Sequence, residues 1–470
     1  MAYTGVRVSG DRMKIADKIY IHQEKEPVSG DIFSHLTYEN PDYYQKMNLG
    51  LYVGNIPKEI RTYTMRGNVL EIMRGEALKI KPYIKNFTYE FHHPDHPISL
   101  RYINNDFDLD EYQEAAVQAI KGKRQGIIHA VTSAGKSLII LKAIVEIGQR
   151  AVIVVHRKIL MEQLLKDIKK YIRDEKGNEI KPGIIGSGSV SLGDITVAID
   201  KTLSRNLPAF REQFGVAILD ECHIAPAQTI SDLINSINAR NRYGFSGTLK
   251  RKDQKEFLIH STFGEVIYKI GKEELLEKGR VVPVKVGIIT TDTQFNWDDA
   301  VQGFIDQEHK NPTQAARHLQ EKTIRLNPAR NEQILRYVAQ LKGKTIVLCR
   351  YVEPCYTLQE GLRTRYGLES GIITGRDGKE GSKSYLAMKD SDLQIVFATI
   401  GCIAEGVSVS DLEHIVLISP LYNNELLLHQ IRGRLMRTFE GKTHGTLHFF
   451  YDQYIFHGGL LKKFLRLIHS

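Results

Sequence analysis

The sequence is poor in cysteine and tryptophan, with four cysteines and one tryptophan among 470 residues. No two cysteines form a Cys-X-X-Cys pair, which argues against a disulfide framework and against a zinc ribbon. We therefore expect buried, reduced thiols at all four positions, which are Cys222, Cys349, Cys355 and Cys402.

Long apolar runs are also absent. No stretch of about 18 apolar residues occurs, so the sequence predicts no membrane span. The first residues, MAYTGVRVSGDRMKIADK, lack the apolar centre of a signal peptide. We expect a protein that stays in the cytoplasm, with no membrane partner and no evident obligate protein partner.

The overall composition is that of a folded globular protein. Apolar residues make up 42% and charged residues 25%, which excludes a disordered chain, a collagen and a coiled coil. The length corresponds to about three domains. Lysine and arginine total 64 against 55 acidic residues, a net charge of +9. That balance is compatible with a polyanionic partner, although many basic proteins bind no nucleic acid.

The first hundred residues differ from the rest in pattern. They are rich in tyrosine and short alternating runs, which predicts a small α+β domain over residues 1–97. A proline- and histidine-rich stretch, residues 91–97, ends this domain and reads as a linker. Its histidines could bind a metal, but exposed linker histidines are the better interpretation because no cysteine or acidic partner has ligand spacing.

Strand, loop and helix then alternate in two long blocks. Apolar runs such as 151–155 and 216–219 are nearly continuous, which indicates parallel sheets covered on both faces. We expect an α/β protein with two tandem parallel-sheet domains, 98–280 and 329–470, that face each other across a cleft. A polar connecting segment, 281–328, holds the single tryptophan, Trp297.

The first chemical motif is the sequence AVTSAGKS at residues 130–137. A phosphate loop needs inward N–H groups, a lysine for the β and γ phosphates and a hydroxyl on Mg²⁺, and Gly135, Lys136 and Ser137 fit those parts. Ala130 stands where the general pattern has glycine. A Gly-Lys-Ser triplet alone is weak, but a strand precedes this one and a helix follows it. We expect ATP and Mg²⁺ as ligands.

The second motif is the sequence DECH at residues 220–223, directly after an apolar strand. Asp220 at the strand end can hold Mg²⁺ through water, together with Ser137. The adjacent Glu221 can orient and deprotonate the attacking water. The alternative is two solvated acids at a strand end, which the upstream phosphate loop disfavours.

The third motif is the basic sequence QIRGRLMR at residues 430–437. Arg434 and Arg437 lie three residues apart, so a helix would place them on one face. Opposite a phosphate loop, such a cationic fork would stabilise charge on the transferred phosphoryl group. A basic helix by itself is more often a solvated face.

These three motifs, in this order, resemble the superfamily 2 nucleic-acid helicases and translocases, whose two motor domains are RecA-like. The resemblance covers about residues 108–455. It implies an ATP site that also involves Tyr112, Gln113, Thr132, Ser133, Ala134, Gly406 and Gln430. It implies coupling residues His223, Ser246 and Thr248. It implies nucleic-acid contacts at Arg157, Thr202, Arg350, Thr374 and Thr399.

A narrower likeness is to the UvsW-type DNA helicases of tailed bacteriophages, carried by the segments 132–137, 220–225 and 244–249. It implies an ATP-driven enzyme acting on forked, junction and single-stranded DNA in replication, recombination or repair, in the host cytoplasm if the chain is phage-encoded. Two alternatives stay open: an ATP-gated binding or annealing factor, and an RNA helicase. The second block disfavours a plain phosphate-loop kinase, and the flanks show no nuclease-like acidic cluster.

The N-terminal domain carries basic and aromatic side chains close together, which suits phosphate contact and base stacking. The alternative is an ordinary solvated face. The residues are Lys58, Arg61, Tyr63, Arg66, Lys79, Lys81, Tyr83 and Lys85.

Overall fold

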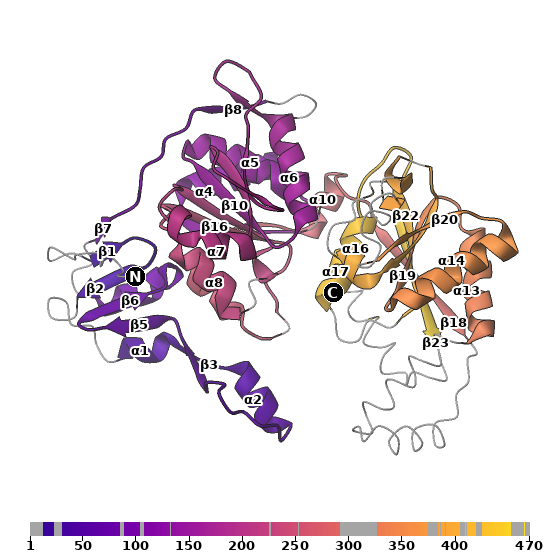
Figure 1. Cartoon of the computed structure of the whole chain (residues 1–470), viewed down its shortest axis with the longest axis horizontal. Helices are drawn as coiled ribbons and strands as arrows, with labels where there is room; N and C mark the ends of the chain where they lie inside the picture. Colours follow the sequence, from indigo (N-terminus) through magenta and orange to yellow (C-terminus); the bar gives the residue numbers. More distant parts are fainter. Residues whose placement is uncertain are drawn as a thin grey trace. The chain divides into compact units, whose positions relative to one another are not determined.

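The computed structural model describes residues 13–22, 31–84, 89–103, 108–131, 133–224, 227–251, 253–291, 327–374, 384–385, 387–390, 392–404, 409, 411–419, 425–452 and 465. The chain divides into two compact units, Met1–Lys272 and Glu273–Ser470 (Figure 1). None of the helices in the described part of the chain combines the length and the hydrophobicity that a transmembrane span requires.

The N-terminal part of the first unit is built on a small mixed sheet. Its strand order is β5 (Tyr63–Arg66), β6 (Val69–Ile72), β2 (Ile19–His22), β1 (Met13–Ile15) and β7 (Tyr89–Phe91). Only the β1–β7 pair is parallel within it. Alternating isoleucines such as Ile19 and Ile21 are buried against Leu70 and Ile72, so the period-two pattern forms one core face. The predicted α+β class is confirmed.

Short elements surround this sheet. They are α1 (Asp31–His35), β3 (Thr37–Glu39), α2 (Pro41–Asn48), β4 (Glu59–Arg61), η1 (Arg74–Glu76), α3 (Ala77–Ile80) and η2 (Lys81–Tyr83). Strands β3 and β4 pair as a ribbon that carries α2 away from the sheet (Figure 1). Helix α2 begins where Asn40 accepts a hydrogen bond from the Asp42 N–H (3.2 Å) and Pro41 occupies the first turn.

The described residues of the first motor domain form an eight-stranded sheet. Its order is β13 (Ser189–Ser191), β12 (Gly183–Gly186), β14 (Ile195–Ile199), β10 (Ala151–Val155), β15 (Val216–Asp220), β16 (Asn241–Ser246), β9 (Gln125–Ala130) and β17 (Val266–Ile270). Every neighbouring pair is parallel except β12 and β13. Strand β10 is buried along its whole length, as its continuous apolar run predicts.

Helices connect these strands and form two groups. They are α4 (Glu111–Gly122), α5 (Lys136–Ile147), α6 (Lys158–Tyr171), α7 (Asp200–Phe210), α8 (Ala227–Ser236) and α9 (Glu256–Phe263), and α10 (Lys272–Glu277) follows β17 at the start of the second unit. Helix α5 packs against α4 and α6, whereas α8 packs against α7 and α9. Right-handed crossovers in opposite directions along the sheet place these groups on opposite faces. Outside the sheet, β8 (Leu100–Tyr102) pairs with β11 (Ile172–Asp174).

The second unit is a six-stranded parallel sheet in the described residues. Its order is β18 (Val284–Thr291), β23 (Gly445–Asp452), β22 (Leu412–Leu417), β19 (Lys344–Cys349), β21 (Ile395–Thr399) and β20 (Ser370–Ile373). Its helices include α13 (Pro328–Gln340), α14 (Val352–Tyr366), α16 (Ile400–Ala404) and α17 (Glu425–Leu435). The prediction of two tandem parallel-sheet domains after a small α+β domain is confirmed.

The connecting segment expected at 281–328 begins with a strand of this second sheet. Strand β18 pairs in parallel with β23 over its full length. Its polar alternation reflects an edge position, where one face is half exposed. Trp297 lies outside the described residues, and the domain boundaries at 97, 280 and 328 remain predictions.

The cysteines are free, as expected. Cys222, Cys349 and Cys355 are buried as expected, whereas the expectation of burial is wrong for Cys402, which is partly exposed. Burial raises the pKa of the Cys222 thiol, with the charge of Glu221 adding to the effect, so this thiol stays neutral and packs as a small apolar group.

Candidate active site

The phosphate loop joins strand β9 to helix α5. Gly135 closes the loop in the left-handed conformation (φ 73°), and a Cβ there would clash with the Gln113 amide, so the position requires glycine. Helix α5 starts at Lys136 and directs its free N–H groups at the loop, an arrangement that favours bound anions. Ser133 is also left-handed (φ 73°). Thr132 lies outside the described residues.

Lys136 lies beside the acidic motif. Its Nζ is 2.8 Å from Oε1 of Glu221, although 84 residues separate it from the start of that motif in the sequence. Burial opposes the charge of the lysine, but Glu221 and Asp220 raise the pKa of Lys136 above its ordinary value. The raised pKa keeps Lys136 charged at neutral pH. Because 13% of its side chain is exposed, a ligand can still reach it.

The two carboxylates of the acidic motif have different environments. Burial, followed by the neighbouring charge of Glu221, raises the pKa of Asp220 to about 6. Burial acts on Glu221 too, but Lys136 and His223 hold its pKa well below the ordinary range. Glu221 also has a left-handed backbone (φ 54°), which is uncommon for a residue other than glycine. Glu221 is therefore the more acidic member of the pair and the first to lose its proton.

A chain of polar contacts leads from this pair to the next strand of the sheet. His223 Nδ1 lies 3.3 Å from Oε2 of Glu221 and 2.7 Å from Oγ of Ser246. The Thr248 N–H donates to the same Oγ of Ser246 (3.2 Å). The three residues expected to couple nucleotide to nucleic acid are thus brought together, and that coupling role remains a prediction.

Oxygen donors suited to Mg²⁺ lie on the same edge of the sheet. Ser137 supplies a hydroxyl and Asp220 a carboxylate, the ligand types that this cation prefers. Ser137 hydrogen-bonds Asp167 of α6, and burial raises the pKa of that aspartate. The donor set fits a magnesium ion, and Asp167 is a further acid near Ser137 that no sequence motif indicated.

Gln113 connects helix α4 to the phosphate loop. Its Oε1 accepts a hydrogen bond from the Asp110 N–H (3.0 Å), and its Nε2 donates to the Ala134 carbonyl (3.2 Å). Tyr112 and Gln113 are both buried. Gln113, which is expected in the ATP site, therefore also fixes the loop that would hold the phosphates.

The expected nucleic-acid contacts all follow strand ends, on the carboxyl edge of their own sheets. In the first unit, Arg157 caps α6 and Thr202 lies in the first turn of α7, both partly exposed. In the second unit, Arg350 is exposed after β19 and Thr399 ends β21 partly exposed. Thr374 is only 6% exposed, which leaves little surface for a ligand.

The arginine motif differs from the expectation. Helix α17 carries Gln430 and Arg434 but ends at Leu435, and Arg437 forms a β-bridge with Val281. The prediction that Arg434 and Arg437 share a helix face is wrong, because this bridge ends the helix first. Gly406 lies outside the described residues.

Lys442 fixes the turn that follows α17. Its Nζ donates to the Leu435 carbonyl (2.8 Å) and to the Arg437 carbonyl (2.9 Å), which satisfies backbone groups at the helix end. Burial lowers the pKa of Lys442 to about 8. Nothing in the sequence pattern distinguished this lysine from a surface charge.

The histidine-rich stretch is packed rather than exposed. His93 Nδ1 lies 2.9 Å from the Asn238 Oδ1, and His96 Nε2 lies 2.7 Å from the Glu212 carbonyl oxygen. Only His92 has the exposed position that the linker interpretation gave to all three. The cause is the path of the segment, which lies against the first motor domain. Among the described residues, no three or more histidine, cysteine, aspartate or glutamate side chains are grouped so that they could hold a metal ion.

Several side chains of the N-terminal basic and aromatic set have partners within the protein. Tyr63 packs on Phe33 with ring centroids 5.1 Å apart. Arg66 pairs with Glu71 (3.1 Å), and Lys79 pairs with the buried Glu76 (2.9 Å). Lys85 lies outside the described residues.

Two family models match the chain. One, described as "Type III restriction enzyme, res subunit", matches residues 106–251, and the other, "Helicase conserved C-terminal domain", matches residues 329–439. The first match ends just after Ser246 and Thr248, and the second contains the arginine motif. The matched ranges correspond to the two parallel-sheet domains.

Similar proteins come from several sources. "Probable helicase D10" of Escherichia phage T5 is 25% identical over 67% of this chain, which covers 65% of that protein's own length. "ATP-dependent DNA helicase uvsW" of Enterobacteria phage T4 is 24% identical over 72% of this chain and 67% of that protein. A solved structure of the DNA-bound Type ISP restriction-modification enzyme LlaBIII shares the fold (TM-score 0.52, 14% identity, 73% of this chain, 27% of that one).

The phosphate loop, the acidic motif and the coupling strand meet at one sheet edge, and both helicase domain models match in the expected order. The chain carries both of these domains and resembles the superfamily 2 helicases, among them the UvsW-type helicases of tailed bacteriophages.

Proposed function

We propose that this protein is an ATP-dependent DNA helicase or translocase that acts on forked and junction DNA. The observation that carries the proposal is the continuous contact chain from Lys136 through Glu221 and His223 to Ser246. These contacts link the phosphate loop to strand β16. A change at the nucleotide can therefore alter the position of the neighbouring strand. Such a link is what a motor needs beyond simple hydrolysis.

The first step is an exchange of partners at Lys136. The amine donates to Glu221, and the phosphates of ATP would draw it into the loop. Glu221 would then be an ionised carboxylate without its lysine, free to take the proton of the attacking water. Ser137 and Asp220 would hold Mg²⁺, which supplies positive charge against the phosphates when bound.

The second step is the response of the coupling residues. Once Glu221 changes partner, the His223 ring loses or strengthens one of its two contacts, and the other contact is with Ser246. Strand β16 ends at that serine, so its position follows the state of the nucleotide. Arg157 and Thr202 emerge from the same sheet edge and are proposed to hold the phosphate backbone of one strand.

The second domain supplies arginines. We propose that Arg434 and Arg437 approach the phosphates from the second domain when ATP draws the two domains together. Arg434→Ala and Arg437→Ala should bind nucleotide with modest weakening and lose most turnover, by less than the factor of about 10³–10⁵ of arginine fingers that act alone. ATPase assays on both single variants and the double variant measure this, and wild-type rates in all three would contradict it.

The preference for forked DNA and the site of action are the finer parts of the proposal. The sequence DECH, in place of DEAD, favours DNA over the RNA substrates of the DEAD-box type. The enzyme would act in the cytoplasm, that of the host if a phage encodes it. An annealing factor gated by ATP is the competing function, because DNA would stimulate its ATPase too.

One experiment separates these functions. Strand displacement and ATPase are measured on matched single-strand, fork, four-way junction and RNA substrates, with ATP and with a non-hydrolysable analogue. A helicase displaces the strand of the fork with ATP and not with the analogue. Equal displacement with both nucleotides, or faster annealing without displacement, would favour the annealing factor.

A further inference from the structure

The N-terminal part and the first motor domain meet through buried polar groups, and Arg242 of β16 crosses this interface. It is 0% exposed. Its Nη2 donates to the Asp17 carbonyl in the N-terminal part (3.0 Å), while Nη1 donates to Asn235 Oδ1 (2.8 Å) in its own domain. Burial lowers the pKa of Arg242 to about 10, so the guanidinium stays charged at neutral pH.

A second arginine crosses in the opposite direction. Arg74 of η1 is 2% exposed, and it donates to the Ala239 carbonyl (2.5 Å) and the Arg240 carbonyl (2.8 Å) in the loop before β16. Burial, with the charge of Arg242 adding to it, lowers the pKa of Arg74. Two buried cations held by carbonyl groups resist separation, because opening the interface would leave these donors unsatisfied.

The N-terminal part also grips helix α9. The buried carboxylate of Glu76 accepts a hydrogen bond from Ser261 Oγ (2.5 Å), and a Cβ on Gly75 would overlap the His260 carbonyl oxygen. These backbones are therefore in direct contact. Two further pairs join the same surfaces: Tyr38 stacked on Phe257 (ring centroids 4.2 Å apart) and Asp42 with Lys255 (2.6 Å).

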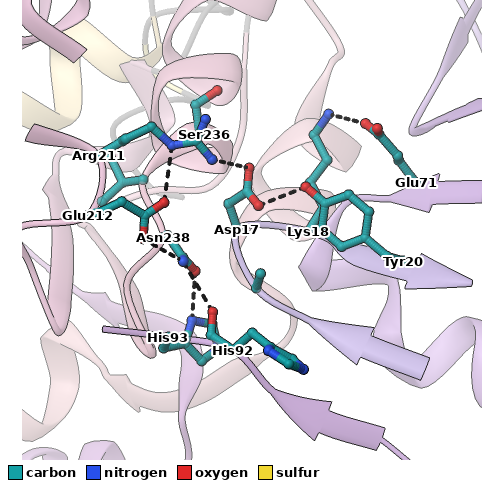
Figure 2. A network of polar contacts seen from close by, with 12 residues as sticks. Asp17, Lys18, Tyr20, Glu71, His92, His93, Arg211, Glu212, Ser236 and Asn238 are labelled. Atoms are coloured by element: carbon teal, nitrogen blue, oxygen red, sulfur yellow. Dashed lines mark hydrogen bonds and ion pairs between the residues drawn. The ribbon is translucent and has the colours of Figure 1, made fainter. Parts of the chain in front are cut away.

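A third set of contacts extends the interface toward the end of helix α7 (Figure 2). The Asp17 carboxylate accepts from the Tyr20 hydroxyl (2.8 Å) and lies 3.5 Å from Arg211. Asn238, just before β16, donates to Glu212 (2.7 Å) and to the His92 carbonyl (3.1 Å). The interface is thus a connected network and not one contact.

The coupling segment lies between the two gripped elements. Ser246 ends β16, which Arg242 holds, and residues 247–248 come before α9, which Glu76 holds. The loop between them is tied to the acidic motif, because Arg251 donates to the His223 carbonyl (2.7 Å). Both flanks of the coupling segment are therefore fixed to the N-terminal part.

We propose that Asp17, Arg74 and Glu76, here called the N-terminal anchor, are positioning residues for coupling. The anchor touches neither the phosphate loop nor the acidic motif. It makes β16, residues 246–248 and α9 move together with the N-terminal part, so that a displacement at Ser246 becomes a displacement of the whole N-terminal part against DNA. The proposal rests on the helicase function proposed above and assigns the anchor a part in it.

The test is the substitution Arg74→Lys in the full chain. A single amine replaces the two nitrogens that now reach Ala239 and Arg240. ATP hydrolysis stimulated by single-stranded DNA should stay close to the wild-type rate, while base pairs opened per ATP should fall by about threefold or more. Arg173→Lys is the matched control, because Arg173 also donates to two backbone carbonyls (2.7 and 2.8 Å) but within the motor domain alone.

The ratio of unwinding to hydrolysis distinguishes coupling from mere stability. A proportional loss of both activities, or an unchanged ratio in a folded Arg74→Lys protein, overturns the proposal. If that variant does not fold, Ser261→Ala takes its place, since it removes only the hydroxyl that donates to Glu76, and an unchanged ratio there counts equally against the anchor. A wild-type protein that hydrolyses ATP without displacing any strand contradicts the helicase function itself, and the anchor with it.

Discussion

Strands β15, β16 and β9 lie side by side, and the two edges of the sheet differ in chemistry there. At the carboxyl edge, Lys136 after β9 pairs with Glu221 after β15 across a partly exposed contact of 2.8 Å. At the amino ends, Arg242 and Arg74 are buried against backbone carbonyls, and Gln125 of β9 donates to the Arg74 carbonyl (2.9 Å). One end holds opposite charges near solvent, and the other holds buried cations on neutral acceptors.

This difference separates an exchangeable contact from a permanent one. The Lys136 and Glu221 side chains are 13% and 25% exposed, and the phosphates of ATP would give Lys136 new anionic partners in place of Glu221. A buried guanidinium that loses its acceptors leaves an unsatisfied charge, so that end should stay closed throughout a catalytic cycle. The sheet can then transmit motion, because its carboxyl edge changes partners while the amino ends of β9 and β16 are held.

Removing the positive charge of Lys136 should have the largest effect on activity. We expect Lys136→Ala to abolish ATP hydrolysis and unwinding, to below about one per cent of the wild-type rate, because this amine is the group placed to reach the β and γ phosphates. Steady-state ATPase with saturating DNA measures it. Lys142→Ala on the same helix is the control, since that lysine pairs with Glu146 on the surface (2.9 Å) and should leave the rate unchanged. Normal turnover in Lys136→Ala would remove the phosphate-loop assignment.

Removing the negative charge of Glu221 should have the second-largest effect on activity. Glu221→Gln keeps the shape of the side chain but cannot accept a proton from water, so hydrolysis should fall by about two orders of magnitude or more. Nucleotide binding should persist and even tighten, because Lys136 would no longer have to break its ion pair with Glu221 before it contacts the phosphates. Fluorescent nucleotide titration alongside the ATPase assay separates the two effects. Normal hydrolysis would mean that another residue acts as the base.

Deleting the N-terminal part, and with it the buried contacts that it makes, should lower stability as well as coupling. A chain that starts at Pro97 loses the Asp17 acceptor of Arg242 and exposes Ser261 and Phe257. From the loss of the hydrogen bond to the buried guanidinium alone, we expect destabilisation by about 2 kcal/mol or more, seen as a lower melting temperature of the motor, together with loss of preference for forks. Melting and fork-to-tail unwinding ratios of both proteins decide this. A truncated protein that melts like the full chain would show that the N-terminal part is dispensable for the motor.

The Lys136–Glu221 contact could be predicted from the sequence, whereas the buried contacts of Arg74 and Arg242 could not. The phosphate loop and the acidic motif are short, continuous segments beside apolar strands, and parallel pairing then brings their ends together. Arg74 and Arg242 belong to no motif, and their acceptors are backbone carbonyls, which any sequence supplies. The same limit applies to Arg437, where a bridge to Val281 ends a helix that the local pattern would have continued.

Acid should slightly weaken the interface between the N-terminal part and the first motor domain, because His93 lies in it. Burial, with Arg74 adding to it, lowers the pKa of His93 from 6.5 to about 3. Between those values the unfolded chain binds a proton that the folded protein does not, so stability should fall as pH falls through this window, by at most about 2 kcal/mol at pH 5. His93→Gln keeps a hydrogen-bonding group for Asn238 and cannot titrate. Its melting temperature should therefore drop less than that of the wild type between pH 7 and pH 5. His92→Gln is the control, because that ring pairs with Glu90 on the surface (3.5 Å) and should leave the wild-type acid response in place. Equal acid sensitivity in His93→Gln and the wild type would mean that the interface does not depend on a neutral His93.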